Sequence, residues 1–202
     1  MNSHSSAAPR YALSFTAGAL LEREAAALAP LYVEHRNWEK VRDLAVEGNL
    51  LQTRTYRTGV RLVREAVKRL SALSDREVEL IPELTASERG HLMWAAACRR
   101  YDLIGEFAEE VLRERFLTLA GAVSHEDFDS FYRGKTMWHD ELDTVSDATY
   151  KKLRQVLFKM MVEAGLLTAK GAIEPALLSA RVTECLTDSA PSDIRFFPTR
   201  EA

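Results

Sequence analysis

Hydrophobic positions recur at steps of three and four residues along most of the chain, which is the spacing of helices with one buried face. The clearest case is residues 147–164, where Ser146 can cap the start and Gly165 can end the helix. Its predicted buried side consists of Tyr150, Leu153, Val156, Leu157, Met160, Met161 and Ala164. Residues 54–70 carry a second such stripe, formed by Tyr56, Val60, Val63, Val67 and Leu70. Both segments are predicted helices.

Shorter periodic stretches and capping signals predict further helices. Thr85 and Glu88, for example, have the spacing of a capping box, and Pro30 is expected to end the first helix. The predicted segments are residues 14–28, 38–48, 74–84, 85–100, 102–119, 124–138 and 176–187. Residues 193–199 are predicted to form an edge strand docked by Phe196 and Phe197.

Two arrangements of these elements are typical of DNA-binding folds. The short helix 38–48, the turn "EGNL" and the helix 54–70 have the order of a helix-turn-helix. After residue 165, "LLTAKGAI" predicts two very short strands around a Lys170–Gly171 turn, which is typical of a winged helix. The predicted fold is therefore all-α, with helix-turn-helix-like lobes and a C-terminal winged-helix-like element containing a short β-hairpin.

The pattern also predicts how the chain divides. We expect a disordered tail over residues 1–12, whose composition is polar. A first helical lobe over residues 13–73 would hold the basic helix, and a second over residues 74–202 would hold the winged element. No long linker separates them, so we expect the lobes to pack together.

The charged residues are unevenly distributed between the two halves of the chain. The net charge is -3, yet residues 1–101 carry 15 Lys and Arg against 12 acids, and residues 102–202 carry 12 against 18. Such a protein is no bulk polycation, and any contact with nucleic acid must come from a local patch.

The segment "RTYRTGVRLVREAVKRL" (54–70) supplies one candidate patch, with six basic residues and the single acid Glu65. At 100° per residue, five of the bases fall within an arc of about 80°, roughly 120° from the apolar stripe. These five are Arg54, Arg57, Arg61, Arg64 and Lys68. Such a row suits a phosphate backbone. Acids from the C-terminal half could equally neutralise it, and the sequence leaves both interpretations open.

A second candidate patch lies on the helix 147–164. Lys151, Lys152, Gln155 and Lys159 share the face opposite its apolar stripe, and Lys170 occupies the predicted wing. In a winged domain this face would enter a major groove. A solvated helix face, or a surface that binds protein, would show the same pattern, and nearby acids such as Asp140 and Asp143 would resist DNA.

Motifs for catalysis or cofactors are missing from the sequence. It has no phosphate-binding glycine loop and no nucleophile elbow. His125 with Asp129 and His139 with Asp143 have helical ligand spacing, but neither pair has a second cluster to complete a metal site. We therefore expect a protein that is no enzyme and has no cofactor, metal or small-molecule substrate. Two distant cysteines and no long apolar run predict a cytoplasmic protein without membrane contact.

Three stretches in the right order resemble the BrxA family, the small helical component of bacteriophage-exclusion (BREX) defence operons. They are "YALSFTAGALL", "WEKVRDLAVEGNLLQTRTYRTGVRLVREAVKRL" and "ELDTVSDATYKKLRQVLFKMMVEAGLL". The resemblance implies a helical protein with helix-turn-helix-like elements, DNA-binding activity and partners among the other BREX proteins. It supplies no catalytic motif to carry over.

Together these observations lead to one main hypothesis and one rival. The main hypothesis is a non-enzymatic component of a phage-defence system that holds double-stranded DNA through phosphates, with weak sequence preference. The rival is a protein–protein adaptor whose basic helix docks an acidic partner.

Overall fold

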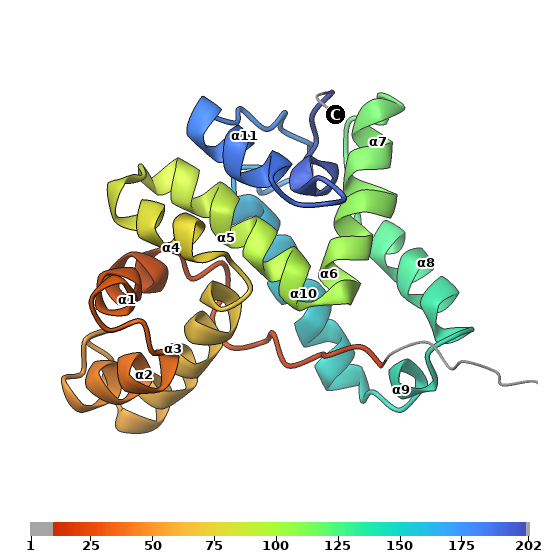
Figure 1. Ribbon diagram of the computed structural model, residues 1–202. Coiled ribbons are helices and arrows are strands. Elements are labelled where there is room, and N and C mark those ends of the chain that lie inside the picture. The colour runs from red at the N-terminus through yellow and green to blue at the C-terminus, as the bar shows by residue number, and fades with distance from the viewer. Residues whose placement is uncertain (1–9, 201–202) are drawn as a thin grey trace, which may run out of the picture.

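A computed structural model describes residues 10–200 and confirms that the chain is mainly helical (Figure 1). The longer helices are α1 (Glu22–His35), α2 (Trp38–Glu47), α3 (Tyr56–Leu70), α5 (Ala86–Arg100), α8 (His125–Thr136), α10 (Asp147–Glu163) and α11 (Ala180–Thr187). The shorter ones are α4 (Asp75–Leu80), α6 (Asp102–Phe107), α7 (Glu114–Leu117) and α9 (Asp140–Asp143), with a π-helical turn η2 (Ala108–Arg113) between α6 and α7. Two 3₁₀ turns, η1 (Ile81–Glu83) and η3 (Asp193–Phe196), complete the set.

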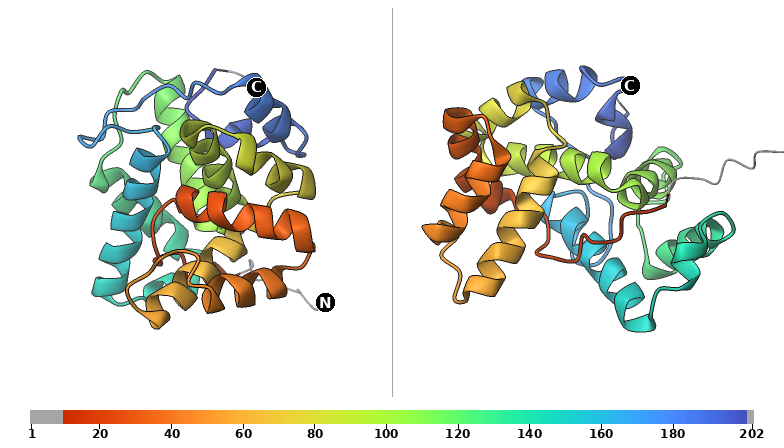
Figure 2. Two further views of the ribbon diagram at one scale, coloured as in Figure 1. Left: turned by 90° about the vertical axis from the view of Figure 1, so that its left-hand side faces the viewer. Right: turned by 60° about the horizontal axis from the view of Figure 1, so that its bottom comes forward.

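Helix α5 is the centre of the molecule. Nine of its positions are buried, including Trp94 and the alanines around it, and it contacts α1, α3, α6, α10 and α11. In Figures 1 and 2 the helices α1–α4 lie on one side of α5, while α6–α9 lie on the other. One hydrophobic core runs through both groups, from Tyr11 to Phe197.

Local capping explains why several helices begin where the sequence predicts. Thr85 and Glu88 form the expected capping box at α5, and Ser124 with Asp127 forms another at α8. Ser146 caps α10 by accepting from the backbone N–H of Thr149. Each cap satisfies an N–H group that has no partner inside the helix.

The first predicted helix is wrong in position. Residues 15–20 form turns and bends, α1 begins only at Glu22, and Pro30 lies inside it. Gly18 and Leu21 adopt left-handed conformations, which interrupts a helix at this point. Burial of Leu28 and Ala29 outweighs the roughly 3 kcal/mol that a proline costs inside a helix.

The C-terminal predictions are corrected in a similar way. The last helix begins at Ala180 rather than at 176, and residues 193–196 form a 3₁₀ turn in place of the predicted edge strand. Phe196 and Phe197 are buried as expected. The backbone carbonyl of Phe196 accepts a hydrogen bond from Nε1 of Trp94 at 2.9 Å, so α5 holds this segment as a turn.

The predicted β-hairpin is reduced to isolated bridges. Leu167 pairs with Ile173, and Ala172 pairs with Ala122, but no regular strand forms in residues 10–200. Only two residues separate Gly165 from the turn that begins at Thr168, and Pro175 has no N–H to extend the pairing. The segment is too short on both sides for strands.

The remaining expectations concern the tail and the membrane. Residues 1–9 of the predicted tail lie outside the described residues, whereas Tyr11 is buried against the core. No helix within residues 10–200 is long and apolar enough to span a membrane.

Candidate nucleic-acid interface

The approach to α3 is a tightly bonded turn. Oδ1 of Asn49 accepts from the backbone N–H of Thr53 at 3.0 Å, and Thr55 caps α3 by accepting from the N–H of Thr58 at 3.2 Å. Gly59 allows the turn to lie against the helix, because a Cβ there would be 2.7 Å from Oγ1 of Thr53. Helices α2 and α3 also pack against each other, so α3 is presented in a defined orientation.

Five basic side chains project from α3 and the residues before it, and we call them the basic face. They are Arg54, Arg57, Arg61, Arg64 and Lys68. All five are exposed, and none is in an ion pair within the part of the chain that the structure describes. The predicted row of cations is therefore exposed, and no acid within residues 10–200 forms an ion pair with it.

The sixth base of the segment has a different role. Arg69 is fully buried, and its Nε donates to Oε1 of Glu65 at 2.9 Å. The hydroxyl of Tyr101 donates to the same carboxylate at 2.8 Å. Burial and the negative charge of Glu65 raise the pKa of Tyr101 to about 12, so the phenol keeps its proton at neutral pH. Glu65 is thus removed from the basic face.

Arg69 also holds the N-terminal segment in place. Its guanidinium donates to the backbone carbonyls of Ala19 and of Leu20, the latter at 3.3 Å. These contacts replace the helical hydrogen bonds that residues 14–20 lack, because buried carbonyls require a donor. Figures 1 and 2 show this segment crossing from the side of α9 to α3.

A groove of about 560 Å³ lies between the N-terminal segment and the basic face. We call it the basic groove; its lining is Ser14, Thr16, Ala17, Tyr56, Arg57, Val60, Arg61, Arg64, Glu65 and Lys68. Tyr56 was predicted to be buried but is 76% exposed. It is the first residue of α3, one turn before the first buried position at Gly59, so no neighbouring helix covers it. The basic groove therefore combines cations, hydroxyl groups and apolar surface with the carboxylate of Glu65, which is paired with Arg69.

The opposite edge of the basic face is mixed in charge. A second groove of about 370 Å³ separates Arg64 from α2. Its α2 wall includes Glu39, Asp43 and Glu47 together with Arg42. These acids form no ion pair with the basic face, but they restrict the approach of phosphates from the α2 side.

The second predicted patch also lies at the surface. On α10, Lys151, Lys152, Gln155 and Lys159 are exposed, opposite a buried side that confirms most of the predicted stripe. Two of these cations have neighbours: Lys152 Nζ donates to Gln155 at 3.0 Å, and Lys159 lies 3.5 Å from Glu163. Lys170 is exposed in the turn between the two bridged segments.

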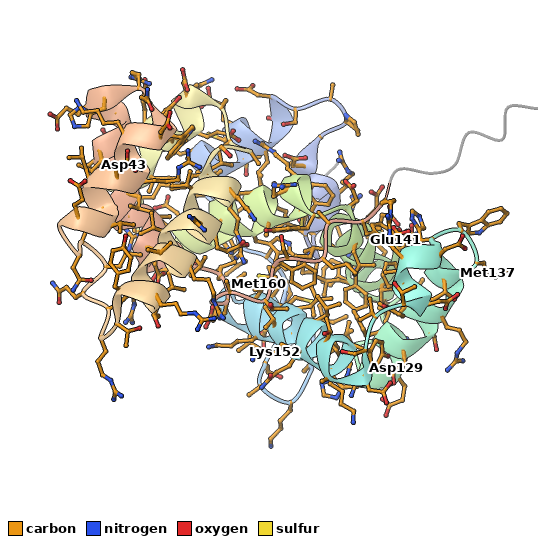
Figure 3. All side chains as sticks on the ribbon, turned by 90° about the horizontal axis from the view of Figure 1, so that it is seen from below. Asp43, Asp129, Met137, Glu141, Lys152 and Met160 are labelled. Atoms are coloured by element: carbon orange, nitrogen blue, oxygen red, sulfur yellow. The ribbon has the colours of Figure 1, made fainter. Side chains whose placement is uncertain are left out.

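The two patches belong to one side of the molecule. Viewed from below, α3 and α10 both lie on the face toward the reader (Figure 3). Arg69 of α3 is 3.4 Å from the sulfur of Met160 on α10, so the C-terminal parts of the two helices meet. The two helices that carry the predicted patches thus lie on one side of the molecule and diverge from this contact.

Sequence reasoning missed three parts of this site. They are the buried Glu65–Arg69 pair, the wall formed by residues 14–17, and the exposure of Tyr56. A Glu followed by Arg four residues later was a visible signal for the first, although such pairs are usually solvated. The wall depends on a long-range contact and had no local signal.

The histidines that had metal-ligand spacing are engaged in ring contacts. His125 meets Phe158 edge-on, and His139 stacks on Tyr11 with ring centroids 4.0 Å apart. Asp129, the formal partner of His125, binds Tyr150 and Arg154. Within residues 10–200 no three His, Cys, Asp or Glu side chains gather in a cluster suited to a metal ion.

Comparisons with known proteins identify similar chains. The family model described as BrxA matches residues 9–190. The protein named "BREX protein BrxA" from Bacillus cereus (strain H3081.97) is 26% identical over 148 residues, 72% of this chain and 74% of that protein. Proteins of the same name from Escherichia coli O9:H4 (strain HS) and Paramagnetospirillum magneticum are 24% and 23% identical, over 73% and 80% of this chain and 70% and 81% of their own lengths.

One solved structure has the same fold. A crystal structure of an uncharacterized protein from Magnetospirillum magneticum superposes with a TM-score of 0.76. It covers 94% of this chain and 98% of its own, at 19% sequence identity. The helical arrangement described above therefore exists in an experimentally determined protein.

Proposed function

We propose that this chain, which belongs to the BrxA family, is a non-enzymatic, DNA-binding component of a BREX phage-defence system. The observation that carries the DNA-binding part is the basic face, five exposed cations without an intramolecular acid among the described residues. Relatives named as BREX proteins support the assignment to such a system, with other BREX proteins as partners.

Phosphate contacts are the chemistry that the basic face supports. Lys and Arg release counterions when they neutralise phosphates, which drives binding without regard to sequence. The hydroxyl of Thr55 donates to the hydroxyl of Thr58 at 2.8 Å, so of these two residues Thr58 keeps a hydroxyl donor for a phosphate. The face has no Asn or Gln to pair with adenine, so we expect weak sequence preference.

The C-terminal element is proposed as a second DNA contact. Ala122 and Leu167 bridge to residues 172–173, and we propose that the turn between the bridged segments serves as a short wing. Lys151, Lys152 and Gln155 would face the duplex and Lys170 would touch its backbone.

An adaptor is the second candidate, and the acids of α2 favour it. Glu39, Asp43 and Glu47 beside Arg64 form a surface of mixed charge, which suits a protein partner better than a polyanion. In this case the basic face would dock an acidic surface on another BREX protein.

Titration of a short duplex separates the two candidates. Binding would be measured at about 50 mM and 200 mM salt for the wild type and for Arg57→Glu/Arg61→Glu/Arg64→Glu. Loss of three phosphate contacts should lower the slope of log K against log salt by about 2.7. All three residues are exposed and have no ion pair within residues 10–200, so the variant should fold.

The matched control is Lys40→Glu/Arg133→Glu/Arg200→Glu, which changes net charge equally at exposed positions outside the basic face. It should bind nearly as the wild type does. Equal weakening in both variants would show that only net charge matters and would reject the basic face as the DNA site. No binding by the wild type at low salt would favour the adaptor.

A further inference from the structure

An exposed apolar corner joins α8 to α9. Met137 and Trp138 are each 75% exposed, and Figure 3 shows Met137 projecting at one end of the molecule. Two adjacent large apolar side chains in solvent are costly, and exposed tryptophan is characteristic of binding surfaces. We call this pair the apolar corner.

The apolar corner is firmly held by its surroundings. The N–H of Trp138 donates to the carbonyl of Lys135 at 3.1 Å, which closes the turn after α8. The next residue, His139, stacks on Tyr11, and the backbone N–H of Tyr11 donates to Glu141 at 2.6 Å. The exposure therefore belongs to a built turn between ordered elements.

The charge around the apolar corner is negative. Asp140, Asp143 and Asp147 follow it and are all exposed. Of the nearby cations, Arg133 is exposed, and Arg10 lies 3.9 Å from Glu141. Lys135 is held between Glu106 at 2.5 Å and Glu110 at 2.7 Å. A polyanion would be repelled here, so the surface suits a partner with a cationic rim and an apolar floor.

The basic groove has that chemistry. Arg57, Arg61 and Arg64 border it, and Val60 and exposed Tyr56 supply apolar and aromatic contact. Trp is the best aromatic partner for an arginine cation. Trp, Tyr and Arg are also the residues that dominate binding energy at protein interfaces. The acids that follow Trp138 would pair with those arginines of the basic groove that Trp138 does not contact.

A chain cannot fill its own groove, because the two surfaces lie apart. Figures 1 and 2 place α3 and α9 on opposite sides of the molecule. In Figure 3, Met137 and Asp43, which borders the basic face, are at opposite ends. Contact between the two surfaces must therefore join separate copies.

We propose that the apolar corner of one copy docks in the basic groove of a second copy, giving a head-to-tail assembly. Such a contact uses different surfaces on each partner, so it extends into a ring or an open chain rather than stopping at a dimer. It goes beyond the proposed function and would compete with DNA for the same arginines.

Mixing two variants, each of which lacks one of the two surfaces, tests this directly. Met137→Ser/Trp138→Ser removes the corner, and Arg57→Glu/Arg61→Glu/Arg64→Glu removes the groove. Sedimentation equilibrium up to about 1 mM protein covers dissociation constants into the millimolar range. The wild type should gain mass with concentration, and each variant alone should stay monomeric. An equimolar mixture should form a heterodimer of twice the monomer mass, because each variant retains the surface that the other has lost.

The mixture also shows that both variants are folded. Leu177→Ser is the matched control, since Leu177 is 86% exposed outside both surfaces, and it should associate as the wild type does. A wild type that stays monomeric throughout, a corner variant that still associates alone, or a mixture without heterodimer would each overturn the proposal. The experiment contains no DNA, so its failure and the failure of duplex binding are separate results.

Discussion

At the residue scale, two adjacent basic residues of α3 have opposite roles. Lys68 belongs to the basic face and is exposed to solvent, while its neighbour Arg69 is fully buried. One step of 100° around α3 separates the two environments. The sequence predicted the exposed cations correctly, because their arc lies away from the apolar stripe. It could not predict the burial of Glu65 and Arg69, because their partners come from Tyr101 and residues 15–20.

The buried pair leads to a prediction about stability. Glu65→Leu should destabilise the fold by about 3–5 kcal/mol, because it leaves the Arg69 cation buried without its counter-charge. Glu65→Leu/Arg69→Met should be less destabilised than the sum of the single changes, since the uncompensated charge is gone. Urea unfolding of the four proteins measures the coupling. The carbonyls of Ala19 and Leu20 stay without their donor in the double variant, so recovery should be partial. Strict additivity would show that the two side chains do not act as a pair.

At the scale of the element, local sequence signals predicted the first residues of helices better than they predicted irregular segments. The helices α2, α3, α5, α8 and α10 begin within two residues of their predicted positions, because caps and hydrophobic spacing are local. Residues 14–20 and 193–196 were assigned the wrong structure, because Arg69 and Trp94 bind their backbone carbonyls from a distance. Isolated bridges replace the predicted hairpin for a simpler reason, the small number of residues available.

The turn before α3 provides a prediction at this scale. Gly59→Ala would normally stabilise a helix by up to about 1 kcal/mol. Here the new Cβ would be 2.7 Å from Oγ1 of Thr53, so the turn must shift, and we expect a loss of about 1–3 kcal/mol. Thr53→Ala removes the opposing oxygen and costs the turn its hydrogen bonds to Asn49 and Thr55.

The double variant Thr53→Ala/Gly59→Ala distinguishes the clash from other causes. It should be more stable than the sum of the two single changes predicts, because the close contact no longer exists. Thermal unfolding with circular dichroism measures all three variants against the wild type. A Gly59→Ala variant as stable as the wild type would show that the turn can shift away from the new Cβ without loss of stability.

At the scale of the whole molecule, several acids of the C-terminal half pair with cations outside the basic face. The sequence raised the possibility that this surplus neutralises the basic face. In the structure, Arg76 instead pairs with Glu184 and Asp188, the latter at 3.0 Å, and Arg99 pairs with Asp193. These contacts attach the C-terminal segment to α4 and α5. Composition alone showed that the charges were unequal, but only the fold decides which cations receive a partner.

The placement of α3 and α10 on one surface allows a final prediction about how duplex DNA is held. A duplex of about 20 base pairs is roughly 70 Å long at 3.4 Å per step, longer than a protein of this size, which is roughly 40 Å across. It can reach both the basic face and α10. A duplex of about 8 base pairs, roughly 27 Å, should settle on the basic face alone. Lys151→Glu/Lys152→Glu should therefore weaken binding of the long duplex and lower its salt slope by about 1.8, while binding of the short duplex changes little.

Fluorescence anisotropy with both duplexes measures this difference, with Lys40→Glu/Arg133→Glu as the control of equal charge. In the control variant, the affinity for the long duplex and the affinity for the short duplex should change by the same factor. If Lys151→Glu/Lys152→Glu weakens both duplexes equally, α10 acts only through the overall field of the protein. If it weakens neither, α10 is not a DNA contact, and its lysines form a solvated helix face. A length-dependent loss requires that one duplex touches both helices, because no property of α10 alone depends on how far the DNA extends.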